Sequence, residues 1–89
     1  MNRREQWRPV LDAEIKKWST KSCAELVREL SDVLAYQVEF EDKKYQVEVQ
    51  LLENTEKYVH VSVDVDDGSF HAPFRPLSSS FIREKPETS

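Results

Sequence analysis

The strongest constraint on the fold is the alternation of polar and apolar residues over residues 36–66. Its apolar members are Tyr36, Val38, Phe40, Tyr45, Val47, Val49, Leu51, Val59, Val61, Val63 and Val65. Successive side chains of a strand point to opposite faces, so the pattern indicates strands with one buried and one solvated face. It predicts three antiparallel strands, over about 36–42, 44–53 and 57–66, with tight turns at 42–44 and 54–56.

A fourth, short strand is expected directly after the third. Gly68 is the only glycine in the chain, and a glycine after Asp67 favours a turn with a positive φ angle. The turn would lead into a strand over 69–75, which Pro73 and Pro76 would confine to an edge. Beyond it, the serines at 78–80 suggest a turn or a helix start, with Phe81 and Ile82 anchoring the segment. Residues 83–89 are charged and expected to be frayed.

Two helices are expected before the strands. Apolar residues at positions 7, 11, 15 and 18 form one stripe of a helix over 7–19, which Pro9 allows to begin at Arg8 or Pro9. Ser22 and Glu25 match a capping box, which predicts a second helix over about 23–33.

These elements give a single α+β domain over 1–89, with its core in 7–82. We predict an N-terminal helical hairpin packed on one face of a three- to four-stranded antiparallel meander, in the order ααββββ. The predicted core is Trp7, Leu11, Ile15, Trp18, Leu26, Leu30, Val38, Phe40, Val47, Val49, Val59, Val61, Val63 and Phe81.

Charge is distributed unevenly. Residues 31–67 hold ten carboxylates and three lysines, whereas the whole chain has a net charge of −4. This excess repels nucleic acid and favours a basic protein or a cation. The single cysteine, Cys23, and the absence of a signal-like apolar run point to the cytoplasm. No stretch approaches the length of a membrane span.

The leading functional hypothesis is a non-enzymatic protein-binding module, similar in kind to an inhibitor, immunity protein or adaptor. Its acidic sheet face would bind a basic partner through Glu39, Glu41, Glu48, Gln50 and His60. The alternative is a cation-binding protein or small metal-dependent enzyme, with carboxylates converging at a turn. Its ligands would be Asp64, Asp66, Asp67 and His71. A third hypothesis is self-association through an open sheet edge, so the chain would be a monomer or a homodimer.

The remaining motifs give less information about function. No catalytic residue and no cofactor is predicted. Cys23 begins a helix, but neither histidine is near it in sequence, so a small buried residue is the preferred interpretation. The serines at 78–80 lack the glycine-flanked elbow of a hydrolase nucleophile. Trp7 and Trp18 fit either the core or an interface.

One part of the chain resembles a known group. The run from Tyr58 to Gly68 (YVHVSVDVDDG), followed by Pro76 to Ile82 (PLSSSFI), is similar to a family of small bacterial α+β domains of unknown function. The resemblance implies a small intracellular bacterial domain and assigns no site residue.

Overall fold

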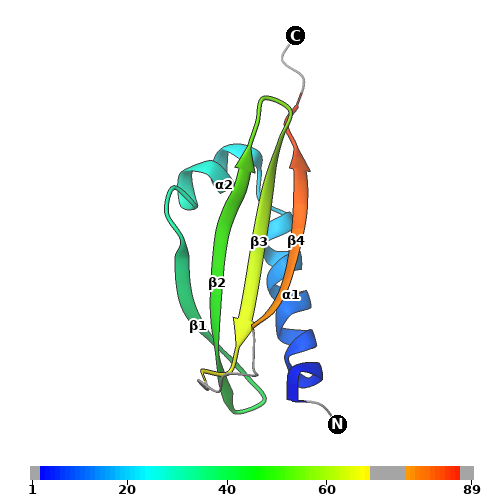
Figure 1. Cartoon of the computed structure of the whole chain (residues 1–89), viewed down its shortest axis with the longest axis vertical. Helices are drawn as coiled ribbons and strands as arrows, with labels where there is room; N and C mark the ends of the chain where they lie inside the picture. Colours follow the sequence, from blue (N-terminus) through cyan, green and yellow to red (C-terminus); the bar gives the residue numbers. More distant parts are fainter. Residues whose placement is uncertain (1–2, 69–75, 87–89) are drawn as a thin grey trace.

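The computed structural model describes residues 3–68 and 76–86 of the chain. A short 3₁₀ helix precedes two α-helices, and four strands follow (Figure 1). The elements are η1 (Arg3–Trp7), α1 (Arg8–Ser19), α2 (Cys23–Glu29), β1 (Leu34–Phe40), β2 (Lys43–Asn54), β3 (Tyr58–Asp66) and β4 (Leu77–Glu84).

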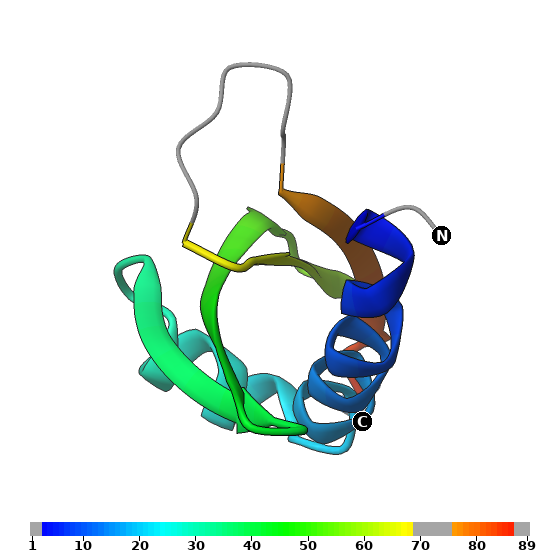
Figure 2. The ribbon, with the colours of Figure 1, turned by 90° about the horizontal axis from the view of Figure 1, so that it is seen from below.

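The four strands form one antiparallel sheet in the order β1-β2-β3-β4. The sheet is strongly curved (Figure 2). α1 packs against β3 and β4 and reaches β1 through a contact between Trp18 and Tyr36. The α+β class and the antiparallel meander are therefore confirmed. The helical hairpin is supported only in part, because α2 has seven residues and α1 twelve.

One core unites both helices with one face of the sheet. Its buried residues are Trp7, Val10, Leu11, Trp18, Cys23, Leu26, Leu30, Tyr45, Val47, Val49, Val59, Val61, Val63 and Val65. Most of the predicted core is confirmed, and both tryptophans are 2% exposed, which places them in the core. Ile15, Val38 and Phe81 are only partly buried. Phe40 was a wrong prediction: it is 36% exposed, and it is the last residue of an edge strand.

The fourth strand of the sheet covers serines for which a turn or a helix start was predicted. β4 is Leu77–Glu84, whereas residues 69–75 lie outside the described residues. Leu77 and Phe81 lie opposite Val65 and Val61 of β3, so they face the core. Ser79 occupies the core-facing position between them. This serine interrupts the alternation of polar and apolar residues from which strands are predicted. The serines at 78–80 are therefore strand residues, not a turn, and Arg83 belongs to the strand rather than to a frayed tail.

The β1–β2 turn lies one residue earlier than predicted. Glu41 and Asp42 have φ angles of 49° and 65°, and Phe40 pairs with Lys43 across the turn. Two central residues with positive φ make a type I′ hairpin turn, which normally takes Asn-Gly. The core register fixes the turn here, since it keeps Tyr36 and Val38 on the buried side.

α2 ends earlier than predicted. The Ser22 hydroxyl caps it by accepting a 3.2 Å hydrogen bond from the Glu25 amide, as the capping box indicated. The helix stops at Glu29, and Leu30 leaves the helical region with φ −109°. Ser31 and Asp32 follow, and such short polar side chains compete with helical hydrogen bonding.

Candidate functional site: the uncovered face of the sheet

Both helices pack on one face of the sheet, so the other face is uncovered by the described residues. The strand register assigns its side chains without ambiguity, because residues on one face alternate with core residues. They are Ala35, Gln37 and Glu39 of β1; Lys44, Gln46, Glu48, Gln50 and Glu53 of β2; Tyr58, His60, Ser62, Asp64 and Asp66 of β3; and Ser78, Ser80, Ile82 and Glu84 of β4.

This uncovered face is acidic. Lys44 is the one cation among its paired strand residues, and it lies opposite Glu39. Glu48 lies opposite Asp64, so two carboxylates occupy neighbouring positions on adjacent strands. Like charges directly opposite each other destabilise a sheet. A cation or a basic side chain placed over this pair would relieve the repulsion.

A second cluster, the His60 cluster, lies at the end of the face near the β2–β3 turn. The imidazole of His60 is held on both sides: its Nε2 is 3.0 Å from the Ser80 hydroxyl, and its Nδ1 is 3.7 Å from Glu53 Oε1. The Tyr58 hydroxyl donates a 3.0 Å hydrogen bond to the other oxygen of Glu53. This hydrogen bond raises the pKa of Tyr58 above its usual value. These contacts bring together four side chains from three strands.

A β-bulge creates this cluster. The β2–β3 register shifts between Leu51 and Glu53, so that Glu53 rather than Leu52 lies opposite His60. A bulge places an extra residue in one strand and redirects the next side chain. Glu48, the other glutamate of β2 on this face, lies opposite Asp64 instead. Leu52 is left 50% exposed at the bulge.

The order of Ser80, His60 and Glu53 is that of a hydrolase triad, but the geometry differs. In such a triad the carboxylate accepts a hydrogen bond from Nδ1, which orients the imidazole as a base. Here that separation is 3.7 Å, longer than a hydrogen bond, and the Glu53 side chain is 52% exposed. The cluster therefore orders side chains on a surface without forming a proton relay.

An exposed apolar residue lies beside the His60 cluster. Ile82 is opposite His60 on β4 and is 58% exposed. With Tyr58 and Pro86 it lines an open depression of about 690 Å³, which Glu56, Lys57, Glu84 and Lys85 surround. An apolar centre with a charged rim is the usual composition of a protein-binding surface.

The residues predicted for protein binding are largely brought together. Glu39, Glu48, Gln50 and His60 share the uncovered face, whereas Glu41 lies in the β1–β2 turn. Sequence reasoning missed Glu53, Tyr58 and Ile82. Tyr58 and Glu53 border the second predicted turn, but the bulge that aligns Glu53 with His60 has no recognisable signal in the sequence.

The proposed metal ligands are differently arranged. Asp66 accepts a 2.7 Å hydrogen bond from the Gly68 amide, which closes the turn, and Asp64 lies 3.4 Å from the Ser62 hydroxyl. Asp67 follows at the end of β3, and His71 lies outside the described residues. Within residues 3–68 and 76–86, no three His, Cys, Asp or Glu side chains form a group that could hold a metal ion.

Cys23 is buried and unpaired. Its thiol lies 3.4 Å from the carbonyl oxygens of Arg83 and Glu84, so it ties the start of α2 to the end of β4. This confirms the interpretation of Cys23 as a small buried residue.

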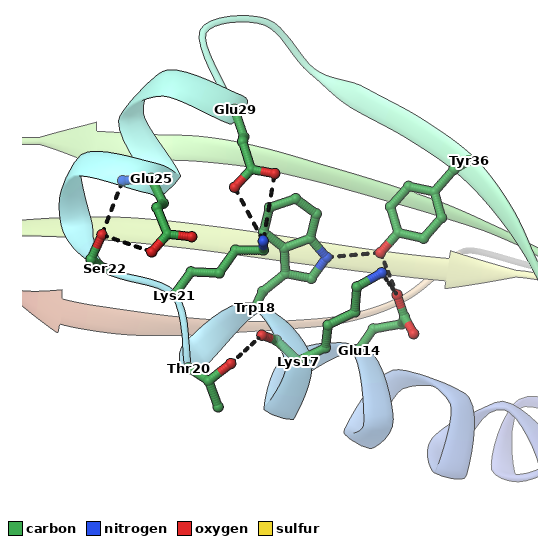
Figure 3. A network of polar contacts seen from close by, with 9 residues as sticks. All are labelled: Glu14, Lys17, Trp18, Thr20, Lys21, Ser22, Glu25, Glu29 and Tyr36. Carbon is green, nitrogen blue, oxygen red and sulfur yellow. Dashed lines mark hydrogen bonds and ion pairs between the residues drawn. The ribbon is translucent and has the colours of Figure 1, made fainter.

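A polar network joins α1 to β1 on the core side of the sheet (Figure 3). The Tyr36 hydroxyl donates to Glu14 and accepts a 2.8 Å hydrogen bond from Trp18 Nε1. Lys17 Nζ lies 4.0 Å from Glu14 and 5.0 Å from the Tyr36 ring centroid. Burial, and then the hydrogen bond to Glu14, raise the pKa of Tyr36 well above its usual value. Every polar group named here has a partner within the fold, so the network fastens α1 to an edge strand.

Neither helix within the described ranges has the length and apolar character needed to cross a membrane. The chain matches no family model, no curated protein and no solved structure.

Proposed function

We propose that this protein is a small non-enzymatic binding module that receives a basic surface of another protein on its uncovered sheet face, in the manner of an inhibitor, immunity protein or adaptor. The observation that carries the proposal is the opposition of Glu48 and Asp64 on that face. Paired carboxylates without a catalytic group beside them favour recognition of positive charge.

The His60 cluster supplies a second element of recognition. Binding energy in protein interfaces concentrates in a few aromatic and apolar residues surrounded by polar ones. Ile82 and Tyr58 fit this description, because Tyr58 is held by Glu53 and Ile82 projects beside it. The carboxylates of the uncovered face would steer the partner electrostatically, and Ile82 and Tyr58 would hold it.

The proposal includes a cytoplasmic location, which the free thiol of Cys23 supports. Binding of a basic protein would account for the acidic side chains of the uncovered face, and it requires no cofactor. The arrangement of Asp64 and Asp66 offers less support for a cation, because the Asp66 carboxylate already accepts from the Gly68 amide.

The test is affinity capture from native lysate, followed by binding measurements with the purified partner. We expect one stoichiometric partner with a basic surface, and an affinity that falls steeply as salt rises. The variant Glu39→Lys/Glu48→Lys should abolish the complex. Both side chains are exposed, so the fold should persist.

A matched control carries the same charge change elsewhere. Glu5 and Asp12 are exposed on η1 and α1, on the helical side of the molecule. Glu5→Lys/Asp12→Lys should leave the complex intact. Equal loss of binding in both double variants would mean that net charge, not this face, governs the interaction, and the proposal would be wrong.

A further inference from the structure

The edge of the sheet formed by β1 has the features of a self-pairing strand. β1 bonds to β2 on one side, and no described strand lies on its other side. We propose that two copies of the chain associate by antiparallel pairing of β1 with β1, with a two-fold axis at Gln37. This interaction goes beyond the proposed function, because it uses the strand edge rather than the uncovered face.

The hairpin geometry shows which backbone groups point outward. A two-residue turn at Glu41 and Asp42 makes Phe40 and Lys43 a hydrogen-bonded pair. Hydrogen-bonded and non-hydrogen-bonded pairs then alternate along the ladder. Ala35, Gln37 and Glu39 fall in the non-hydrogen-bonded pairs, so their backbone N–H and C=O groups point away from β2. These groups are available to a second strand.

The sequence of β1, LAYQVEF, is self-complementary about its centre. With Gln37 opposite Gln37 of the second copy, Ala35 lies opposite Glu39, so no carboxylate faces another across the axis. Gln37 would exchange backbone hydrogen bonds with its equivalent, and Ala35 with Glu39. The outward-pointing groups of all three residues are thereby satisfied in one register.

The apolar residues of β1 match in the same register. On the core side, Tyr36 lies opposite Val38 of the second copy, and Leu34 opposite Phe40. In the single chain, Leu34, Tyr36 and Val38 are only partly buried and Phe40 is 36% exposed, whereas the valines of β3 are 0% exposed. Pairing would cover apolar surface that the helices leave open.

β1 has few of the features that protect edge strands, and its one charged residue is Glu39. Natural edges are blocked by lysine, proline, bulges or a covering helix. β1 contains neither lysine nor proline, and its pairing with β2 is regular. The opposite edge differs, because α1 packs against β4 and Arg83 lies within that strand. Of the two edge strands, β1 is therefore the one that pairs with a second copy.

Pairing of this kind continues the sheet from one copy to the next. The helices of both copies remain on one face, and the two acidic faces form one surface on the other. A basic partner with two contact regions would then bind both copies together. α2 connects to the Leu34 end of β1, so antiparallel pairing places the two α2 helices at opposite ends of the shared edge.

The first test measures molar mass by light scattering and sedimentation from micromolar to millimolar concentration. We expect the wild type to reach twice the mass of the chain. Gln37→Lys should lose the dimer, because it places two cations opposite each other at the axis. Gln46→Lys adds the same charge to the neighbouring strand, away from the axis, and should remain dimeric. A wild type that stays monomeric throughout overturns the proposal.

The second test reports the register directly. Cys23→Ser removes the native thiol, and Gln37→Cys then places two thiols opposite each other at a spacing that a disulfide can bridge. We expect rapid disulfide dimers for Gln37→Cys and none for Gln46→Cys under the same mild oxidation. Equal cross-linking of the two, or a dimer that Gln37→Cys fails to cross-link, overturns the β1 pairing. A monomer that still binds a basic partner would refute the pairing alone and leave the proposed function intact.

Discussion

The two faces of β3 differ completely although they share one strand. The core-facing residues are four valines, each 0% exposed. The opposite positions hold five side chains of four chemical kinds, namely Tyr58, His60, Ser62, Asp64 and Asp66. Valine fits a pleated, buried surface well, so the uniform face stabilises the fold. The varied face contributes little packing and is where binding chemistry can reside.

Each face of the sheet also has a tyrosine whose hydroxyl donates a hydrogen bond to a glutamate. Because the two pairs have the same chemistry, comparing them shows the effect of burial on stability. Tyr36 and Glu14 lie on the core side, and Glu14 is 8% exposed. Tyr58 and Glu53 lie on the uncovered face. Losing this hydrogen bond lowers the free energy of unfolding more where water cannot replace the lost partner. The following predictions test this difference, beginning with the largest effect.

Val61→Asp should destabilise the protein by about 3–5 kcal/mol, because it buries an unpaired charge. Ser62→Asp, the next residue on the other face, should change the melting temperature little. Chemical denaturation of both variants measures the difference. Cooperative unfolding of Val61→Asp at wild-type stability would contradict the assignment of the two faces.

Tyr36→Phe should cost about 1–3 kcal/mol, since it removes the hydrogen bond donated to the buried Glu14 carboxylate and the one accepted from the Trp18 indole N–H. Tyr58→Phe removes the equivalent hydroxyl on the exposed side and should leave the melting temperature nearly unchanged. Thermal and urea unfolding of both variants provide the measurement. Equal losses would show that burial does not distinguish the two pairs.

Stability should also fall at alkaline pH. The folded-state pKa of Tyr36 is raised above its ordinary value of 10.0, so the folded protein holds the phenolic proton more tightly than the unfolded chain. Its contribution is fully present below pH 10 and is lost as pH rises further toward the folded-state pKa. Unfolding free energies measured from pH 8 to 11 should decline less steeply in Tyr36→Phe. Identical slopes would argue against the network.

Ile82→Asp should have the smallest effect on stability, because the side chain is 58% exposed. If Ile82 anchors a partner, this variant should nevertheless weaken binding more than Ser78→Asp, which adds the same charge to the same face of β4. Titration calorimetry with the captured partner compares the two. Similar affinities would remove Ile82 from the binding surface.

The first three strands were predictable because local alternation and core packing agree along β1, β2 and β3. β4 was not, since Ser79 occupies a core-facing position and breaks the apolar pattern. A strand read from sequence alone depends on that pattern, whereas in the folded chain the ladder to β3 supplies the missing stability. The length of α2 was overestimated because Val33 continued the helical spacing after Ser31 and Asp32 had already ended the helix.

For the candidate site, the sequence predicted which residues share one face of the sheet but not which of them contact each other. Period-two alternation placed Glu39, Glu48 and His60 on the same side of the sheet, but it carries no information on which residues lie opposite each other. Cross-strand register depends on the turn at Glu41 and on the bulge at Leu52, and a shift of one residue changes every pairing.

The sequence by itself therefore determined the class of the fold, the two helices, three of the four strands and the separation of an apolar face from an acidic one. Those properties follow from the spacing of side chains along one segment. Only the tertiary structure decided that Glu53 meets His60, that Glu48 meets Asp64, and that β1 and β4 form the two edges of the sheet. Such juxtapositions join residues distant in the chain, and they are fixed by the packing of the whole core.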